Sequence, residues 1–143
     1  MHIKHISSVQ NPLIKHVILL TEKSRERKKS GLFIVEGLRE IELAAKGPYD
    51  IETILFYADL FPEDHLDSLH LNAFQYIELS KDIYQKIAYR ETTEGIIAIA
   101  KSKENTIEKL NFKNNNPLIL DAEAPEKTWK YRSYFTLRRC GQR

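Results

Sequence analysis

The chain has 143 residues, enough for one domain with a hydrophobic core, and 42% hydrophobic with 29% charged residues excludes a disordered chain. A single cysteine excludes an internal disulfide bond and predicts a reducing compartment. No apolar run reaches the length of a signal peptide core or of a membrane span. We therefore expect a cytoplasmic protein without membrane contact.

The first predicted element is a helix over Asn11–Lys29. Asn11 can cap its free amides, and Pro12 fits the first position, where no N–H is needed. Gly31 is expected to stop this helix. Its apolar face is predicted from side chains at helical spacing, namely Leu13, Ile14, Val17, Ile18 and Leu20.

A short strand, Leu32–Val35, is predicted next, and Gly37 permits a sharp turn after it. A helix over Leu38–Ala45 follows and ends at Gly47. We expect Glu36 to be structural, with its carboxylate accepting backbone amides at the start of this helix.

The pattern then repeats along the chain. The run at 96–100 is almost wholly apolar, which predicts a strand that is covered on both faces. Strands that alternate with helices predict an α/β domain with a largely parallel sheet and helices packed on it. The remaining expected elements are strands Ile51–Tyr57, Tyr76–Leu79 and Ile96–Ala100 and helices Glu63–Leu69 and Lys81–Ala88, the last capped by Ser80.

Charge is distributed unevenly along the chain. Every acidic residue lies at or before Glu126, whereas the segment from Lys127 onward carries six basic residues. Taking these six from the total of 22 leaves 16 basic against 20 acidic residues, so the rest of the chain has a net charge of −4. The tail also contains Trp129 and Cys140, the only residues of their kinds. Such asymmetry is typical of a basic arm that binds nucleic acid.

Three stretches in order carry a family resemblance: Ser7–His16 (SSVQNPLIKH), Phe33–Glu40 (FIVEGLRE) and Thr92–Lys101 (TTEGIIAIAK). Together they closely resemble the N-terminal RNA-substrate-binding domain of SpoU-type (TrmH-like) RNA 2′-O-ribose methyltransferases. Pro117–Lys127 (PLILDAEAPEK) resembles the first strand and loop of that family's S-adenosylmethionine domain.

The resemblance implies a three-layer α/β/α sandwich of the kink-turn-binding ribosomal-protein type for residues 1–101. It further implies a linker at 102–116 and an incomplete methyltransferase domain at 117–127. The chain would then be the RNA-binding portion of an rRNA or tRNA methyltransferase, inactive alone, without catalytic or cofactor-binding residues of its own. S-adenosylmethionine binding and homodimer formation would belong to the full-length family. A stand-alone RNA-binding module of ribosomal-protein type and a protein-interaction domain are the alternatives.

The resemblance stops at Lys127, where the family's motif should begin Pro-Gly-Asn and Thr128–Arg143 reads TWKYRSYFTLRRCGQR. Trp-Lys must be encoded TGG-AA(A/G), so reading one nucleotide along forces a Gly codon. With permitted codons the segment becomes PGNIGAILRSADAGN, which is the missing motif. We hypothesise a single-nucleotide insertion after Lys127; the rival interpretation is a genuine basic tail that binds RNA.

Two surfaces are candidates for RNA contact. The first is the basic cluster Lys23–Lys29 at the end of the first predicted helix. Clustered Lys and Arg supply sequence-independent affinity for phosphates, although a solvated helix end favoured by the helix dipole explains the same charges. The second is the polar loop Arg90–Gly95, which suits sugar and phosphate contacts. The alternative is that this loop has only a structural role, as a turn that ends the preceding helix. The predicted RNA-binding residues are Asn11, Lys15, Lys23, Arg25, Arg27, Lys28, Lys29, Arg39, Arg90, Thr92 and Thr93.

Other chemistry is not indicated. His65 and His70 are five residues apart, which is not the spacing that places two metal ligands on one helical face, so we expect no metal site. Residues Asp50–Glu78 contain seven acidic side chains and no Lys or Arg. That part of the domain should repel RNA and face away from it.

Resequencing of the gene across the Lys127 codon tests the insertion hypothesis. We expect a neighbouring frame that encodes the methyltransferase motif. A frame that reads Thr-Trp-Lys, with no such motif beside it, would leave the basic tail as the correct interpretation.

Overall fold

A computed structural model describes residues 2–47, 49–69, 73–89 and 94–103. The chain divides into two compact units, Met1–Glu104 and Asn105–Arg143, and all the described residues belong to the first. The predicted methyltransferase start at 117–127 and the tail at 128–143 lie outside the described residues, as does all but the start of the predicted linker.

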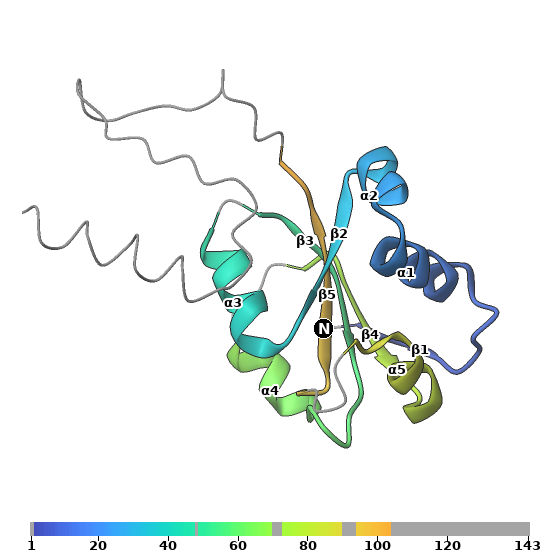
Figure 1. Ribbon diagram of the computed structural model, residues 1–143. Coiled ribbons are helices and arrows are strands. Elements are labelled where there is room, and N and C mark those ends of the chain that lie inside the picture. The colour runs from blue at the N-terminus through green and yellow to red at the C-terminus, as the bar shows by residue number, and fades with distance from the viewer. Residues whose placement is uncertain (1, 48, 70–72, 90–93, 104–143) are drawn as a thin grey trace, which may run out of the picture. The chain divides into compact units, whose positions relative to one another are not determined.

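Strands and helices alternate along most of the described chain (Figure 1). In chain order the elements are β1 (Ile3–Ile6), α1 (Pro12–Glu22), α2 (Ser24–Ser30), β2 (Leu32–Glu36), α3 (Leu38–Lys46), β3 (Ile51–Phe56), α4 (Glu63–Ser68), β4 (Gln75–Leu79), α5 (Lys81–Ile87) and β5 (Ile96–Lys101).

The five strands form one mixed sheet in the order β1-β4-β3-β5-β2. β1, β4 and β3 pair in parallel, but β5 pairs antiparallel with both β3 and β2, so the sheet is less parallel than the alternation of elements predicts. β5 therefore starts at the end of the sheet where β4 finishes.

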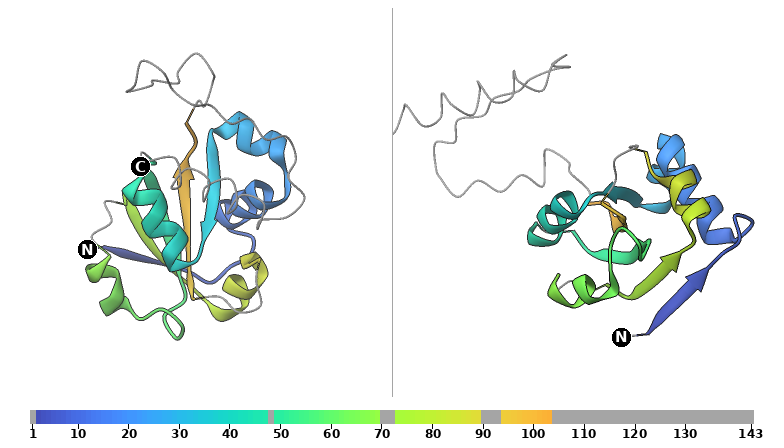
Figure 2. Two further views of the ribbon diagram at one scale, coloured as in Figure 1. Left: turned by 60° about the vertical axis from the view of Figure 1, so that its left-hand side comes forward. Right: turned by 90° about the horizontal axis from the view of Figure 1, so that it is seen from below.

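Helices cover both faces of the sheet, which gives three layers (Figure 2). β5 demonstrates the division, since alternate side chains of a strand point to opposite faces. Ile97 and Ile99 belong to the core on the side of α1 and α5, and Ile96, Ala98 and Ala100 to the core on the side of α3 and α4. All five are at most 1% exposed, so the prediction that this strand is covered on both faces is confirmed.

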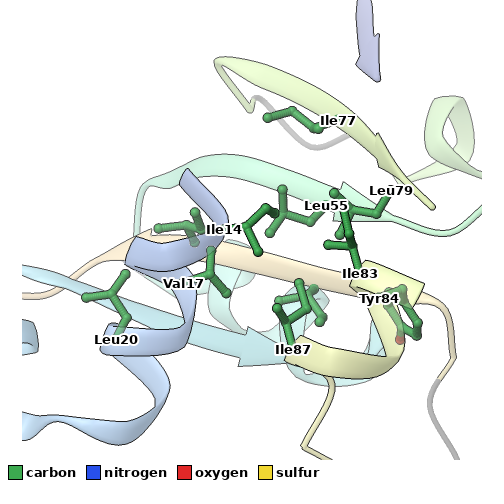
Figure 3. Close-up of a cluster of buried hydrophobic side chains, with 11 residues drawn as sticks. Ile14, Val17, Leu20, Leu55, Ile77, Leu79, Ile83, Tyr84 and Ile87 are labelled. Atoms are coloured by element: carbon green, nitrogen blue, oxygen red, sulfur yellow. The ribbon is translucent and has the colours of Figure 1, made fainter. Parts of the chain in front are cut away.

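The core under α1 and α5 explains why these two helices form where they do. Their buried side chains point at the sheet and meet Leu55, Ile77 and Leu79 of β3 and β4 (Figure 3). Each fully buried aliphatic side chain contributes roughly 1.5–3 kcal/mol relative to an exposed one. The helical side chains in this core are Ile14, Val17 and Leu20 of α1 and Ile83, Tyr84 and Ile87 of α5.

The single helix predicted over Asn11–Lys29 is wrong, because the chain breaks it at Lys23, where the backbone is extended (φ −117°, ψ 110°). The last buried side chain of α1 is Leu20, and α2 contains no apolar residue at all. Without an apolar stripe, nothing holds the second segment against the sheet in line with the first. Gly31 ends α2 in the left-handed conformation, as predicted (φ 67°).

Two further glycines allow turns at the opposite end of β2. Gly37 has φ 100°, which confirms the predicted sharp turn into α3. Gly95 has φ 77°, and a Cβ there would lie 2.6 Å from Leu60 Cβ and 2.8 Å from the Phe61 backbone nitrogen. Only glycine fits both the backbone conformation and the space at this position.

The sequence analysis missed β1, a four-residue strand at the sheet edge that pairs in parallel with β4. Ser80 does precede α5, as expected, but its side chain makes no capping hydrogen bond. Within the described ranges, no helix is long and apolar enough to span a membrane.

Candidate nucleic-acid interface

Among the described residues, the densest group of cations lies on α2 and at its N-cap, and we call the exposed side chains Lys23, Arg25, Lys28 and Lys29 the α2 patch. Basic residues in the last turn also interact favourably with the negative end of the helix dipole. Glu26, the acidic residue of α2, is half-buried and lies 3.9 Å from His16 Nε2 on α1. The exposed face of α2 is therefore mainly cationic.

Arg27 differs from its neighbours because it is half-buried and bonded to the protein itself. Its Nη1 donates hydrogen bonds to the backbone carbonyls of Leu20 (2.7 Å) and Thr21 (3.1 Å). These carbonyls belong to the last turn of α1, where no amide of the same helix remains to pair with them. Arg27 thus caps the C-terminus of α1 and fixes α2 against it.

The α2 patch adjoins the place where the described chain leaves the sheet. Leu32, at the start of β2, pairs with Lys101, at the end of β5. The Ser102 amide then donates to the Gly31 carbonyl over 2.7 Å. Exposed Lys101 and Lys103 extend the cationic character of this end. The sequence analysis missed both, because only the strand register reveals that they neighbour α2.

A second group of candidate residues surrounds the β2–α3 turn, Glu36–Leu38. Arg39 is exposed in the first turn of α3. The Glu36 carboxylate accepts the Tyr89 amide at 3.0 and 3.2 Å, and Glu94 Oε2 accepts the Leu38 amide at 2.5 Å. Glu36 is structural, as expected, but the amide at the start of α3 is bound by Glu94 instead.

Of the other predicted residues, two lie in the described part of the chain and three lie outside it. Asn11 is the N-cap of α1, where its Oδ1 accepts the Leu13 amide at 2.9 Å, which confirms the predicted cap. Lys15 is exposed on the same helix. Arg90, Thr92 and Thr93 lie outside the described residues.

The α2 patch and Arg39 do not form one continuous surface. α2 precedes β2 and Arg39 follows it, and β2 has five residues. At about 3.3 Å per residue, the two groups are separated by roughly 13 Å along the strand. The structure thus presents two separate groups of candidate residues, at opposite ends of the β2–β5 ladder (Figure 1).

The acidic segment predicted to face away from RNA includes α4, which packs on the face of the sheet opposite α1. Exposed Glu63 and Asp64 begin this helix. No three His, Cys, Asp or Glu side chains in the described part of the chain could together hold a metal ion.

Residues 11–98 match the sequence profile of the MRM3-like substrate binding domain. The chain belongs to this family. No curated protein matches it significantly. Among solved structures, an RNA 2′-O-ribose methyltransferase is similar with 31% identity and a TM-score of 0.62, over 75% of this chain and 41% of that one.

Two more distant structures share the fold. One is an rRNA methyltransferase from Sinorhizobium meliloti, with 18% identity and a TM-score of 0.58 over 72% of this chain and 38% of that one. The other is the SpoU methyltransferase AviRb from Streptomyces viridochromogenes in complex with AdoMet, with 16% identity and a TM-score of 0.62 over 73% and 40%. The chain thus spans about two fifths of the length of these enzymes.

Arg27 and Arg25 of this MRM3-like domain form a matched pair for separating structural from RNA-binding charge. Arg27→Ala should lower the free energy of unfolding by about 1–2 kcal/mol, because it leaves carbonyls of α1 without a donor. Exposed Arg25→Ala should change it by less than about 0.5 kcal/mol. Urea denaturation measures both values, and equal losses would contradict the capping role.

Proposed function

We propose that the chain is the RNA-binding portion of an S-adenosylmethionine-dependent 2′-O-ribose methyltransferase that acts on rRNA or tRNA, and that the α2 patch contacts RNA phosphates. The observation that carries the proposal is the group of four exposed cations on α2 and at its N-cap, Lys23, in a helix that itself packs no apolar side chain into the core. Membership of a substrate-binding family and similarity to RNA methyltransferases support it.

Binding must come from local charge, because the chain up to Glu126 is net acidic. Clustered Lys and Arg side chains gain affinity by releasing the counterions condensed on the nucleic acid, whatever its sequence. The acidic helix α4 on the opposite face disfavours RNA there and orients the complex. Charge on the two faces therefore favours one mode of approach.

The location of the α2 patch also suits a domain that delivers RNA to a catalytic partner. The described chain leaves the sheet at Lys101–Lys103, and Ser102 is bonded directly to Gly31 at the end of α2. RNA held on α2 is therefore close to the point from which the chain continues. In the full-length enzyme, methyl transfer and S-adenosylmethionine binding belong to the region that follows.

The layered arrangement gives further support. Helices on both faces of a five-stranded mixed sheet are consistent with a sandwich of the kink-turn-binding ribosomal-protein type. Proteins of that type recognise structured RNA. We therefore expect a folded RNA, with paired and unpaired segments, as the partner of this chain.

A filter-binding salt titration with structured RNA tests the proposal. Replacing Arg25, Lys28 and Lys29 together by Ala should weaken binding. It should also make the plot of log K against log salt shallower, by roughly 0.7–0.9 for each phosphate that the variant no longer neutralises. Arg27 is left intact because its loss would also loosen α1.

The matched control replaces Lys4, Lys46 and Lys81, three exposed cations outside α2, by Ala. It removes the same charge and should leave the slope nearly unchanged. A form without Thr128–Arg143 separates the tail from the domain. If that form loses all binding while the α2 variant keeps it, the tail is the RNA arm and the assignment to α2 is wrong.

A further inference from the structure

The β2–α3 turn and the segment between α5 and β5 are joined by two carboxylates that act in opposite directions. Glu36, from the turn, accepts the Tyr89 amide just after α5. Glu94, just before β5, accepts the Leu38 amide in the turn. The Gly37 amide adds a backbone hydrogen bond to the Ile96 carbonyl at 3.2 Å. Tyr89 is thus bonded to the same turn as the start of β5.

Tyr89 combines a fixed backbone with a free ring. Its amide is held by both oxygens of Glu36, and the preceding amide, of Ala88, donates to the Tyr84 carbonyl at the end of α5. Nevertheless, 83% of Tyr89 is exposed. An aromatic side chain has few rotatable bonds, so little further entropy is lost when its ring is covered.

From this geometry we propose that Tyr89 stacks on an unpaired base of the bound RNA and that Glu36 is the positioning residue that presents it. Bases splayed from loops and bulges are recognised by stacking on aromatic rings. The inference rests on the proposed RNA-binding function and adds a second contact at the end of β2 opposite α2.

The charges near Tyr89 favour a base over a phosphate. The Glu36 carboxylate accepts the Tyr89 amide and the Glu94 carboxylate accepts the Leu38 amide, and both negative charges disfavour an approaching phosphate. A nucleobase is uncharged and presents a flat face. The α2 patch would accordingly contact the RNA backbone, and Tyr89 would recognise a single-stranded base.

Phe74 provides the internal comparison. It is 81% exposed, but Lys101 Nζ lies over its ring, 5.5 Å from the centroid. Phe74 follows α4 in the chain, and its backbone amide donates to the Glu52 carbonyl within the acidic segment. A cation already interacts with one side of this ring, so we assign the stacking role to Tyr89 and use Phe74 as the control.

Fluorescence titration with an RNA hairpin that carries 2-aminopurine in its loop tests the proposal, using the whole chain. Stacking of this base on Tyr89 should quench its emission. Tyr89→Ala should abolish the quenching and weaken binding roughly 5- to 100-fold, while the salt slope set by the α2 patch persists. Tyr89→Phe should behave as the unmodified chain. Phe74→Ala, which removes the ring beside Lys101, should keep the quenching.

Two results would overturn the proposal in distinguishable ways. If Tyr89→Ala keeps both affinity and quenching while the α2 variant loses affinity, stacking is refuted and RNA binding stands. If the unmodified chain does not bind the hairpin at any salt concentration, the RNA-binding function falls together with the stacking.

Two variants of Glu36, one that keeps the hydrogen-bond acceptor and one that removes it, test the positioning role of this residue. Glu36→Gln retains a side-chain oxygen that accepts the Tyr89 amide and should keep the quenching. Glu36→Ala should reduce the quenching although the ring is still present, and circular dichroism verifies that the variant is folded. Unreduced quenching in folded Glu36→Ala would remove Glu36 from the proposal.

Discussion

The burial of β5 on both faces is the constraint on which the rest of the domain depends. Its apolar run has hydrogen-bonded neighbours on either side and requires helices above and below it. α1 and α5 supply one cover, and α3 and α4 the other. Because the two covering layers consist of amphipathic helices, their outer faces and the turns between elements are left for polar chemistry.

The ladder between β2 and β5 also determines where that chemistry lies. One end brings Gly31 and α2 to the chain exit at Ser102, and the other brings the β2–α3 turn to Gly95. At each end a carboxylate or guanidinium binds backbone groups: Arg27 at the first end, and Glu36 with Glu94 at the second. The exposed cations and Tyr89 are held in position by these internal bonds.

Most of the fold follows from the sequence because its patterns are local. Periodicity and glycine positions predict the elements from β2 to β5 to within about two residues, and the family resemblance identifies the domain. The break at Lys23, the reversed direction of β5 and the edge strand β1 depend on tertiary contacts. The same applies to the site: the cationic run is visible in the sequence, but the capping role of Arg27 and the Glu36–Tyr89 bond are not.

The central claim is that RNA lies across the ends of the β2–β5 ladder and not on the acidic face. Ultraviolet crosslinking of the whole chain to a structured RNA, followed by mass spectrometry of the peptides, tests it most directly. We expect adducts on the peptide that contains α2 and on Tyr89, and none within Asp50–Glu78. Adducts confined to the acidic segment or to Thr128–Arg143 would contradict it.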